Sequence, residues 1–466
     1  MEDDTPVHGQ RVHLPSDLEA KVSEDGSKHS SSPQQDIMQP NDVELTTVPS
    51  LALSNGLHDP IALTGAAPEG GWAAWMAVLA SFFTIMNTWG VIISFGVFQP
   101  YYVSTLHRTR SDIAWIGSIA VFLLFFMGII SGRLTDAGYF RATTTIGAFL
   151  VVLGTFMTSL CHTYWQVIIA QGVCTGLGNG LLLTPMMTLI TAYFSKRLAL
   201  VMGIAACGSV TGGLIYPSMA RTLLPSIGFG WTMRSIGFIQ LGTFAVALAC
   251  GRPRQTQKKS GPVVDWSVLK EMTFTLFFLG AFFSFMGVFF PFFFLSSYAG
   301  EKRGLSYTES LDLTLILNGI GFAGRLMPSL FARRIGTLNV FIAYVFASAL
   351  CMYTWVPVHS TAGLYVWTAF YSLSVGGVQS LALAVVPIIN SDMSKIGARM
   401  GIISAALGTG SLIGSPVSGA IISANGGSYV GAQVFSGSGL IVGGLFIFAA
   451  REVKRRQKQA GCWMKV

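Results

Sequence analysis

The chain has 466 residues, of which 52% are hydrophobic and only 11% are charged. Soluble domains carry about 25% charged residues, so this composition excludes an ordinary soluble protein. The net charge of +8 does not indicate nucleic-acid binding, because the basic residues lie in short loops between apolar segments, where they set membrane topology. The expected partners are a lipid bilayer and a small-molecule substrate, and no nucleic acid.

Sequence signatures of catalysis and of metal binding are missing. The six cysteines show no paired spacing, and the seven histidines lie in the N-terminal tail or in loops. No Gly-Lys-Ser/Thr phosphate loop occurs, which argues against an ATP-driven pump. We therefore predict no catalytic residues, no metal site, no cofactor and no enzymatic activity.

Residues 1–68 contain eleven acidic and three basic residues, and their Ser, Gln and Pro runs predict a disordered acidic tail. Apolar segments follow, each close to the roughly 20 residues that a membrane helix needs. Backbone groups find no water in lipid, so these segments must be helices. Twelve of them are expected, at 72–98, 112–132, 142–161, 164–187, 198–219, 231–250, 268–297, 311–332, 338–357, 363–389, 399–421 and 430–450.

The polar stretch 251–270 lies between two sets of six segments. It predicts a first six-helix bundle over 69–250, a linker over 251–270, a second bundle over 271–450 and a basic tail over 451–466. If both termini are cytoplasmic, the inner loops and tail carry 19 Lys and Arg residues and the outer loops carry five. That excess fits the positive-inside rule, so we expect the linker and both termini in the cytoplasm.

Short motifs recur between the two predicted bundles at similar depths. The pairs are Gly96–Pro100 with Gly287–Pro291, Gly132–Leu134 with Gly324–Leu326, and Met202–Ile204 with Met400–Ile402, at offsets of 191, 192 and 198 residues. Six spans per half is an even number, so the halves point the same way and form a parallel repeat. The predicted fold class is an all-α membrane protein with 12 transmembrane helices in two six-helix parallel repeats, which describes the major facilitator fold.

The loop Gly132–Arg141 resembles the major facilitator signature Gly-x-Leu-x-Asp followed by basic residues. In that family the carboxylate, here Asp136, docks against the N-terminal end of span 11, near Ala398. The resemblance implies a gating role for Asp136 with Arg133 and Arg141. An ordinary charged turn is the alternative interpretation.

Two further stretches are similar to the monocarboxylate porter family, in the form of its fungal branch. One is the start of span 1, with Glu69, Gly70, Gly71 and Trp72, and the other precedes span 5, with Tyr193, Phe194, Lys196 and Arg197. The resemblance covers about 400 residues, from Pro68 to the end of span 12. We interpret these motif residues as structural, because Trp suits the membrane interface and Lys and Arg hold a cytoplasmic helix end.

The sequence departs from the members of that family that carry lactate with a proton. Those members are similar in carrying a Lys in span 1 and, in span 8, an Asp four residues before an Arg. Here Arg325 is present, but Gly321 stands four residues before it and span 1 has no Lys. The nearest acid on that span, Asp312, lies about 20 Å along the helix. We therefore do not expect the usual lactate–proton symport.

Arg325 is the sharpest candidate for substrate binding. An Arg at membrane depth costs about 2.5 kcal/mol or more, so it faces a cavity or a partner. We interpret it as an anchor for an anionic or carbonyl-bearing substrate, with a snorkelling Arg as the alternative. Further polar candidates on cavity-lining spans are Asn87, Asn179, Asn318 and Gln379. Helix–helix hydrogen bonds are the alternative role for each of them.

Span 7 holds eleven of the 33 Phe residues, between Phe274 and Phe294. We expect lipid-facing packing to explain most of them, with a few facing inward to give a largely apolar pocket.

The sequence predicts a secondary transporter of the cell membrane that moves an organic anion or amphipathic metabolite by alternating access. The resemblance to the fungal branch implies either uptake or export, and efflux of a fungal secondary metabolite is slightly favoured. Uptake of monocarboxylates or riboflavin is one alternative. A non-transporting nutrient sensor is another.

Overall fold

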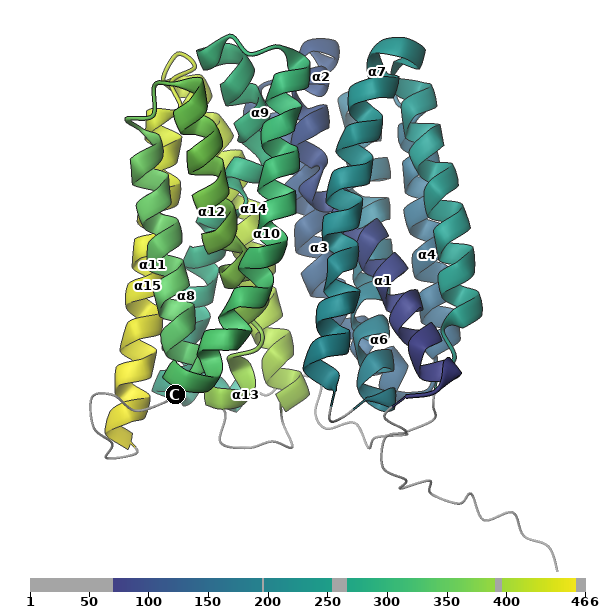
Figure 1. Cartoon of the computed structure of the whole chain (residues 1–466), viewed down its shortest axis with the longest axis vertical. Coiled ribbons are helices and arrows are strands. Elements are labelled where there is room, and N and C mark those ends of the chain that lie inside the picture. The colour runs from purple at the N-terminus through teal and green to yellow at the C-terminus, as the bar shows by residue number, and fades with distance from the viewer. Residues whose placement is uncertain (1–69, 195–196, 254–265, 390–395, 458–466) are drawn as a thin grey trace, which may run out of the picture. The chain divides into compact units, whose positions relative to one another are not determined.

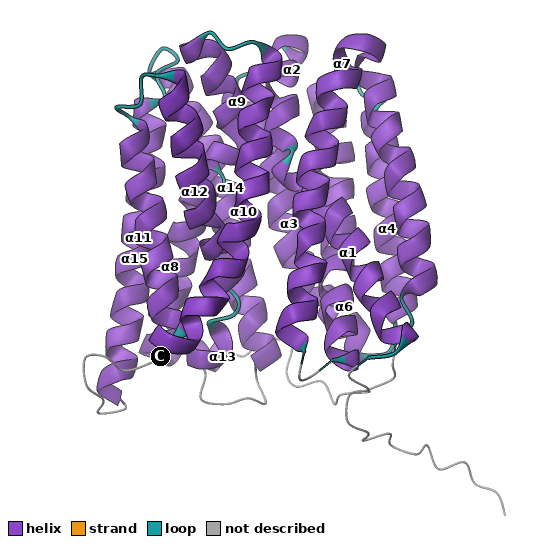
Figure 2. Ribbon diagram, in the orientation of Figure 1, coloured by secondary structure: helices purple, strands orange, loops and turns teal. Residues whose placement is uncertain are grey.

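The computed structural model describes residues 70–194, 197–253, 266–389 and 396–457. The predictions for the tail 1–68, for Glu69, for Lys196 and for most of the linker lie outside these residues. All the described helices belong to one compact unit, Leu63–Val466. Within the described ranges every regular element is a helix, and ten helices are long and apolar enough to cross a membrane (Figure 2). The prediction of an all-helical membrane protein is confirmed.

The first half of this unit follows the predicted order of spans closely. Its elements are α1 (Trp72–Ile93), α2 (Phe95–Leu106), α3 (Arg110–Asp136), α4 (Phe140–Thr158), α5 (Tyr164–Val167), the π-helix η1 (Ile168–Cys174), α6 (Thr175–Tyr193) and α7 (Leu198–Cys250).

The second half begins with a short 3₁₀ helix and continues with the longer helices. Its elements are η2 (Trp266–Lys270), α8 (Met272–Val288), α9 (Phe290–Arg303), α10 (Tyr307–Ile335), α11 (Thr337–Trp355), α12 (Thr361–Leu381), α13 (Val386–Ile389), α14 (Ile396–Ala424) and α15 (Val430–Gln457). Helix α15 continues past Ala450, so the first seven residues of the predicted tail extend the last helix.

Helix α7 is a bent pair of helices. A straight helix of its 53 residues would be about 80 Å long, far more than the 40–45 Å of a whole bilayer. Gly228 has φ 76° and ψ 172°, a left-handed conformation that glycine adopts without steric cost. This residue lets α7 turn back on itself, as its ribbon does in Figure 1. The two segments predicted at 198–219 and 231–250 lie on either side of this turn.

A seven-residue π-helix interrupts the span that contains α5 and α6. It runs from Ile168 to Cys174, directly between these two α-helices. π-Helical turns are rare, and they occur mostly as single turns inserted into α-helices. Within the turn, Gln171 accepts a hydrogen bond of 2.5 Å from the hydroxyl of Tyr102 on α2. The turn is therefore tied to the first span of the same half.

The helices of residues 72–250 gather on one side of the unit and those of 266–457 on the other (Figure 1). We call the end that carries Gly251 and Lys270 the linker end. The opposite end, where α2 and α9 lie, is the distal end (Figure 1). Both copies of the repeated Gly-Val-Phe-x-Pro motif lie beside a break, between α1 and α2 and between α8 and α9.

The expectation that most span 7 phenylalanines face lipid is wrong. Eight of the eleven are buried, with exposed fractions of 4% or less: Phe274, Phe277, Phe285, Phe289, Phe290, Phe292, Phe293 and Phe294. The physical reason is that α8 and α9 are covered on most sides, by α15 and α14 along α8 and by α2 and α10 along α9. These rings fill the contacts between helices.

Candidate functional site

The two halves meet mainly along three pairs of helices. Helix α3 packs against α14, α7 against α10, and α2 against α9 at the distal end. Alternating access requires such contacts to break and re-form, so polar groups at these seams are candidates for substrate binding and gating. The α7–α10 seam carries Arg325 and Asn318, two of the substrate-binding candidates predicted from the sequence.

Three residues of α10 form polar contacts across this seam with the first part of α7. We call this series of contacts, taken from one end of the seam to the other, the ladder. Near the linker end, Arg325 donates to the Ser209 hydroxyl. Two helical turns further along, the Asn318 amide donates to the carbonyl oxygen of Gly213 at 3.1 Å. At the distal end, Asp312 accepts from Arg221 at 2.6 Å. Asp312 thus pairs with the other half, in agreement with the prediction that it cannot reach Arg325 along its own helix.

Arg325 is held by uncharged groups alone. Its second terminal nitrogen donates to the Gln379 side-chain oxygen at 2.8 Å, which joins α10 to α12. No carboxylate bonds to this guanidinium among the described residues. A partly buried cation with neutral partners keeps an unneutralised charge, which suits an anionic or carbonyl-bearing ligand. The structure therefore brings together Arg325 and Gln379, which sequence analysis had named separately.

Two buried side-chain atoms of this bonding network have no hydrogen-bond partner in the described part of the chain. They are the Asn318 side-chain oxygen and the Gln379 side-chain nitrogen. A buried polar atom without a partner costs about 1–3 kcal/mol. The acceptor and the donor are thus available to a substrate or to water.

Asn87 and Asn179 belong to the first half. Asn87 accepts from the Tyr216 hydroxyl and donates to the Thr243 hydroxyl at 2.8 Å, so its bonds join α1 to both parts of α7. Asn179 is buried on α6, and its side-chain oxygen has no partner among the described residues. Asn87 therefore has the helix–helix bonds that were its alternative role, whereas Asn179 keeps an open acceptor.

At the distal end of the unit, the backbones of α2 and α9 lie in close contact and close the gap between the halves. A Cβ atom placed on Gly96 of α2 would lie under 3.0 Å from the carbonyl oxygen of Phe292 on α9. Beside it, the Phe95 and Phe293 rings pack edge to face with centroids 5.0 Å apart. Arg110 adds an ion pair to Glu301 at 2.7 Å. These contacts join the two halves, so they must separate for the distal end to open.

A chain of aromatic rings crosses between the halves. Trp89 packs on Phe125, Phe125 on Phe285, and the series continues through Phe289 and Phe293 to Phe95, with centroids 5.0–6.2 Å apart. The rings come from α1, α3, α8, α9 and α2. This arrangement offers apolar, aromatic surface where the halves meet.

The Arg221–Asp312 pair provides a test of the ladder. Both side chains are about one-third exposed, and exposed pairs contribute about 0.2–1 kcal/mol. Arg221→Ala or Asp312→Ala should therefore shift the equilibrium toward distal opening by up to about fivefold. The measurement is maleimide labelling of a Ser111→Cys reporter, since Ser111 bonds to Pro416 across the α3–α14 seam. The charge-swapped double variant should restore the labelling rate, and a rate unaffected by either single change would contradict the assignment.

The residues proposed for gating lie at the linker end. Asp136 is the last residue of α3 and is partly buried. Ile129, seven residues earlier on α3, packs against Gly401 of α14. The two helices are antiparallel, so this register brings Asp136 close to the level at which α14 begins, Ile396. Arg133 lies on the same turn as Asp136, whereas Arg141 is exposed on α4 and lines a separate cavity with Arg252.

The family-motif residues hold helix ends. Trp72 is 80% exposed at the start of α1, next to Gly70 and Gly71, which both have positive φ. The Tyr193 hydroxyl donates to the Arg252 carbonyl oxygen at 2.9 Å, and the Phe194 ring packs edge to face on Trp75. Arg197 is exposed at the start of α7. The motif residues that the structure describes therefore lie at helix ends, where Tyr193 and Phe194 contact neighbouring segments of the same half.

Sequence reasoning missed several residues of the seams: Ser209, Arg221, Arg110 and Glu301. Asp312 had been considered only as a partner for Arg325, and the two arginines only in the charge count. Opposite charges at matching ends of spans 5 and 8 were the signal that pointed to the Arg221–Asp312 pair.

Comparison with known proteins identifies the class. The pattern of the Major Facilitator Superfamily matches residues 77–389. An MFS-type transporter of Gibberella zeae is 45% identical over 386 residues, covering 82% of this chain and 88% of the relative. The chain belongs to the Major Facilitator Superfamily, and it is a multi-pass membrane protein and a secondary transporter.

Two further relatives carry more specific names. The aspyridones efflux protein apdF of Emericella nidulans is 33% identical, covering 83% of this chain and 79% of the relative. The agnestins efflux protein AgnL12 of Paecilomyces divaricatus is also 33% identical, covering 81% of this chain and 87% of the relative. The relatives are transporters, in agreement with the expectation that the chain is not an enzyme.

Proposed function

We propose that this transporter exports an organic anion or amphipathic fungal secondary metabolite by alternating access, with Arg325 as the substrate anchor. The observation that carries the proposal is the Arg325 guanidinium, which lies at the seam between the halves with only Ser209 and Gln379 as partners in the described chain. The open acceptor of Asn318, the open donor of Gln379 and the aromatic chain between the halves fit a solute that is largely apolar with few polar groups. The names of the two efflux relatives favour export.

The finer topology is part of the same proposal. Twelve spans result if α7 counts as two, if α1 with α2, α5 with α6 and α8 with α9 count as one span each, and if α12 with α13 is also a span. The bundles are then 69–250 and 271–450, and the linker end and both termini are cytoplasmic because of the charge asymmetry. The monocarboxylate porter type is supported by the motifs around Trp72 and Tyr193, and the cell membrane is the proposed location.

Gating is proposed to use Asp136 and Arg133 at the cytoplasmic end. Asp136→Asn should remove about 0.3–1 kcal/mol of interaction with the N-terminal end of α14, a shift of roughly two- to fivefold toward the inward-open state. Turnover should fall, and outer labelling of the Ser111→Cys reporter should slow. If labelling and turnover both match those of the parent protein, Asp136 has no gating role.

The function itself is tested in the producing fungus. Metabolites inside and outside cells are compared among the parent strain, a deletion strain, and strains that express the protein or its Arg325→Ala variant. Export predicts that one organic anion or amphipathic compound accumulates inside deletion cells and returns to the medium only with the parent protein. Accumulation outside deletion cells would show uptake, and an unchanged profile would contradict transport of a native metabolite.

A further inference from the structure

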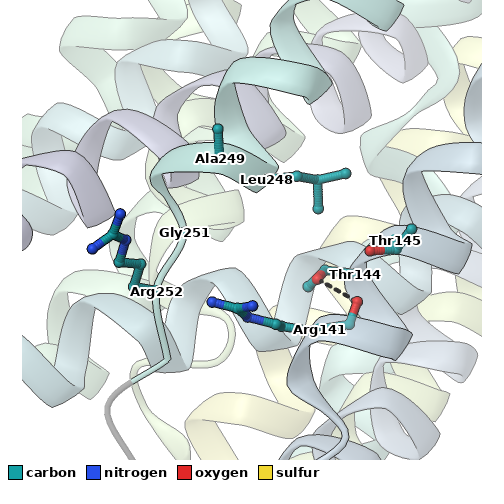
Figure 3. Close-up of a pocket in the computed structure, with 7 residues that line it drawn as sticks. All are labelled: Arg141, Thr144, Thr145, Leu248, Ala249, Gly251 and Arg252. Carbon is teal, nitrogen blue, oxygen red and sulfur yellow. Dashed lines mark hydrogen bonds between the residues drawn. The ribbon is translucent and has the colours of Figure 1, made fainter.

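A cavity of about 440 Å³ lies at the linker end, away from the seams between the halves. It is formed by the start of α4 and the end of α7, and its lining includes Arg141, Thr145, Leu248 and Arg252. The Arg141 side chain extends from α4 toward the Gly251–Arg252 segment (Figure 3). Both helices belong to the first half, so this cavity is separate from the substrate seam.

The charge of the cavity is unbalanced. Its two arginine side chains are exposed, and neither guanidinium has a hydrogen bond or ion pair within the described ranges. No acidic residue contributes to its described lining. Guanidinium groups match phosphate oxygens with paired hydrogen bonds, and two of them beside one cavity favour a phosphate-bearing anion. The exposed Thr145 adds a hydroxyl that can donate to the same group.

The surface beside the cavity identifies the source of that phosphate. Ile146 and Phe149 on α4 are 53% and 62% exposed, and Leu241 and Val246 on α7 are 50% and 42% exposed. Helices α4 and α7 pack together, and all four residues lie further along these helices, away from the ends that form the cavity. A free phosphate ion would use only the arginines, whereas a phospholipid would use the arginines for its headgroup and the apolar surface for its acyl chains.

We propose that this cavity binds the headgroup phosphate of an anionic phospholipid. With the proposed topology, which this inference uses, the lipid belongs to the cytoplasmic leaflet, where anionic lipids concentrate. Because Arg252 lies at the start of the linker and Arg141 in the first turn of α4, the bound lipid would join the linker to the first half. The linker would then be held at its first residues while the halves rock.

Binding is tested on the purified full-length protein by native mass spectrometry. Phosphatidylglycerol, phosphatidylcholine and inorganic phosphate are added separately. We expect at least one tightly bound phosphatidylglycerol, and the Arg141→Gln/Arg252→Gln variant should bind it about tenfold more weakly. The matched control is Arg334→Gln, an exposed arginine at the linker end of α10 that lies outside the cavity and should keep full affinity.

Two outcomes would overturn the proposal. One is equal affinity of the double variant and the parent protein for phosphatidylglycerol. The other is a result in two parts: inorganic phosphate competes with phosphatidylglycerol, and Phe149→Asn changes the affinity for neither of these two ligands. That result would assign the cavity to a free anion. If the glutamine variant does not fold, Arg141→Lys/Arg252→Lys retains the charge and should weaken binding by a smaller factor, because lysine lacks the paired donors. These readouts need no transport, so they stand apart from any failure of the proposed export.

Discussion

Replacing Arg325 with alanine is expected to reduce transport by roughly ten- to 150-fold while surface expression is retained, because a hydrogen bond to a charged group contributes about 1.5–3 kcal/mol. The Arg325 guanidinium donates one hydrogen bond to Ser209 on α7 and another to Gln379 on α12. Its removal takes away both the proposed substrate anchor and a bond between the halves. The measurement is the initial efflux rate of the identified metabolite, normalised to the amount of protein at the cell surface.

Matched variants separate these two roles of Arg325. Ser209→Ala removes the bond between the halves and leaves the guanidinium in place, so it should reduce transport by less than Arg325→Ala does. Arg325→Lys keeps the charge and loses the planar pair of donors, and it should keep part of the activity toward an anion. Efflux kinetics for Arg325→Ala equal to those of the parent protein would remove this residue from the substrate site.

Gly96→Ala is expected to stop transport by preventing closure of the distal end. The added methyl group would lie under 3.0 Å from the Phe292 carbonyl oxygen, which is backbone and cannot rotate away. Helix α2 would then have to withdraw from α9, and the Phe95–Phe293 ring contact would be lost with it. We expect turnover to fall by tenfold or more, at about 1.4 kcal/mol per tenfold, and outer labelling of the Ser111→Cys reporter to rise.

Two other glycines serve as controls for Gly96. A methyl group on Gly414 would also meet a backbone carbonyl, that of Met286, but both residues lie in the second half. Gly414→Ala should therefore lower thermal stability without exposing the distal end. A methyl group on Gly242 would meet no atom within 4 Å, so Gly242→Ala should change neither the thermal stability nor the exposure of the distal end. If Gly96→Ala gives the same result as Gly414→Ala, the α2–α9 contact is structural and has no part in gating.

The helices could be predicted from the sequence because lipid imposes a strict rule on the backbone. A segment such as 142–161 must satisfy all its hydrogen bonds internally, so its length and apolar character suffice to predict α4. The same rule does not say which side chains meet. Gln379 and Arg325 could be named one by one from their polarity, whereas their bond depends on the packing of α10 against α12.

The burial of the phenylalanines shows the same limit. Lipid tails and helix contacts are equally apolar, so hydrophobicity does not distinguish a ring that faces lipid from one that faces a neighbouring helix. The span that contains Phe285 and Phe290 therefore looked like a lipid-facing surface in the sequence. Its burial follows from the position of α8 and α9 between four other helices, which is a property of the tertiary fold.

The π-helix at Ile168–Cys174 sets the direction of the side chains that follow it in the same span. A π-helical turn accommodates an extra residue, so every side chain after it points in a direction rotated by about 100° from that of an uninterrupted α-helix. Helix α12, at the matching place in the second half, is α-helical from Thr361 to Leu381. Asn179 follows the π-helical turn on α6, so its amide points in a direction about 100° from the one that an uninterrupted α-helix would give it. This π-helical segment therefore decides which neighbours the open acceptor of Asn179 can reach.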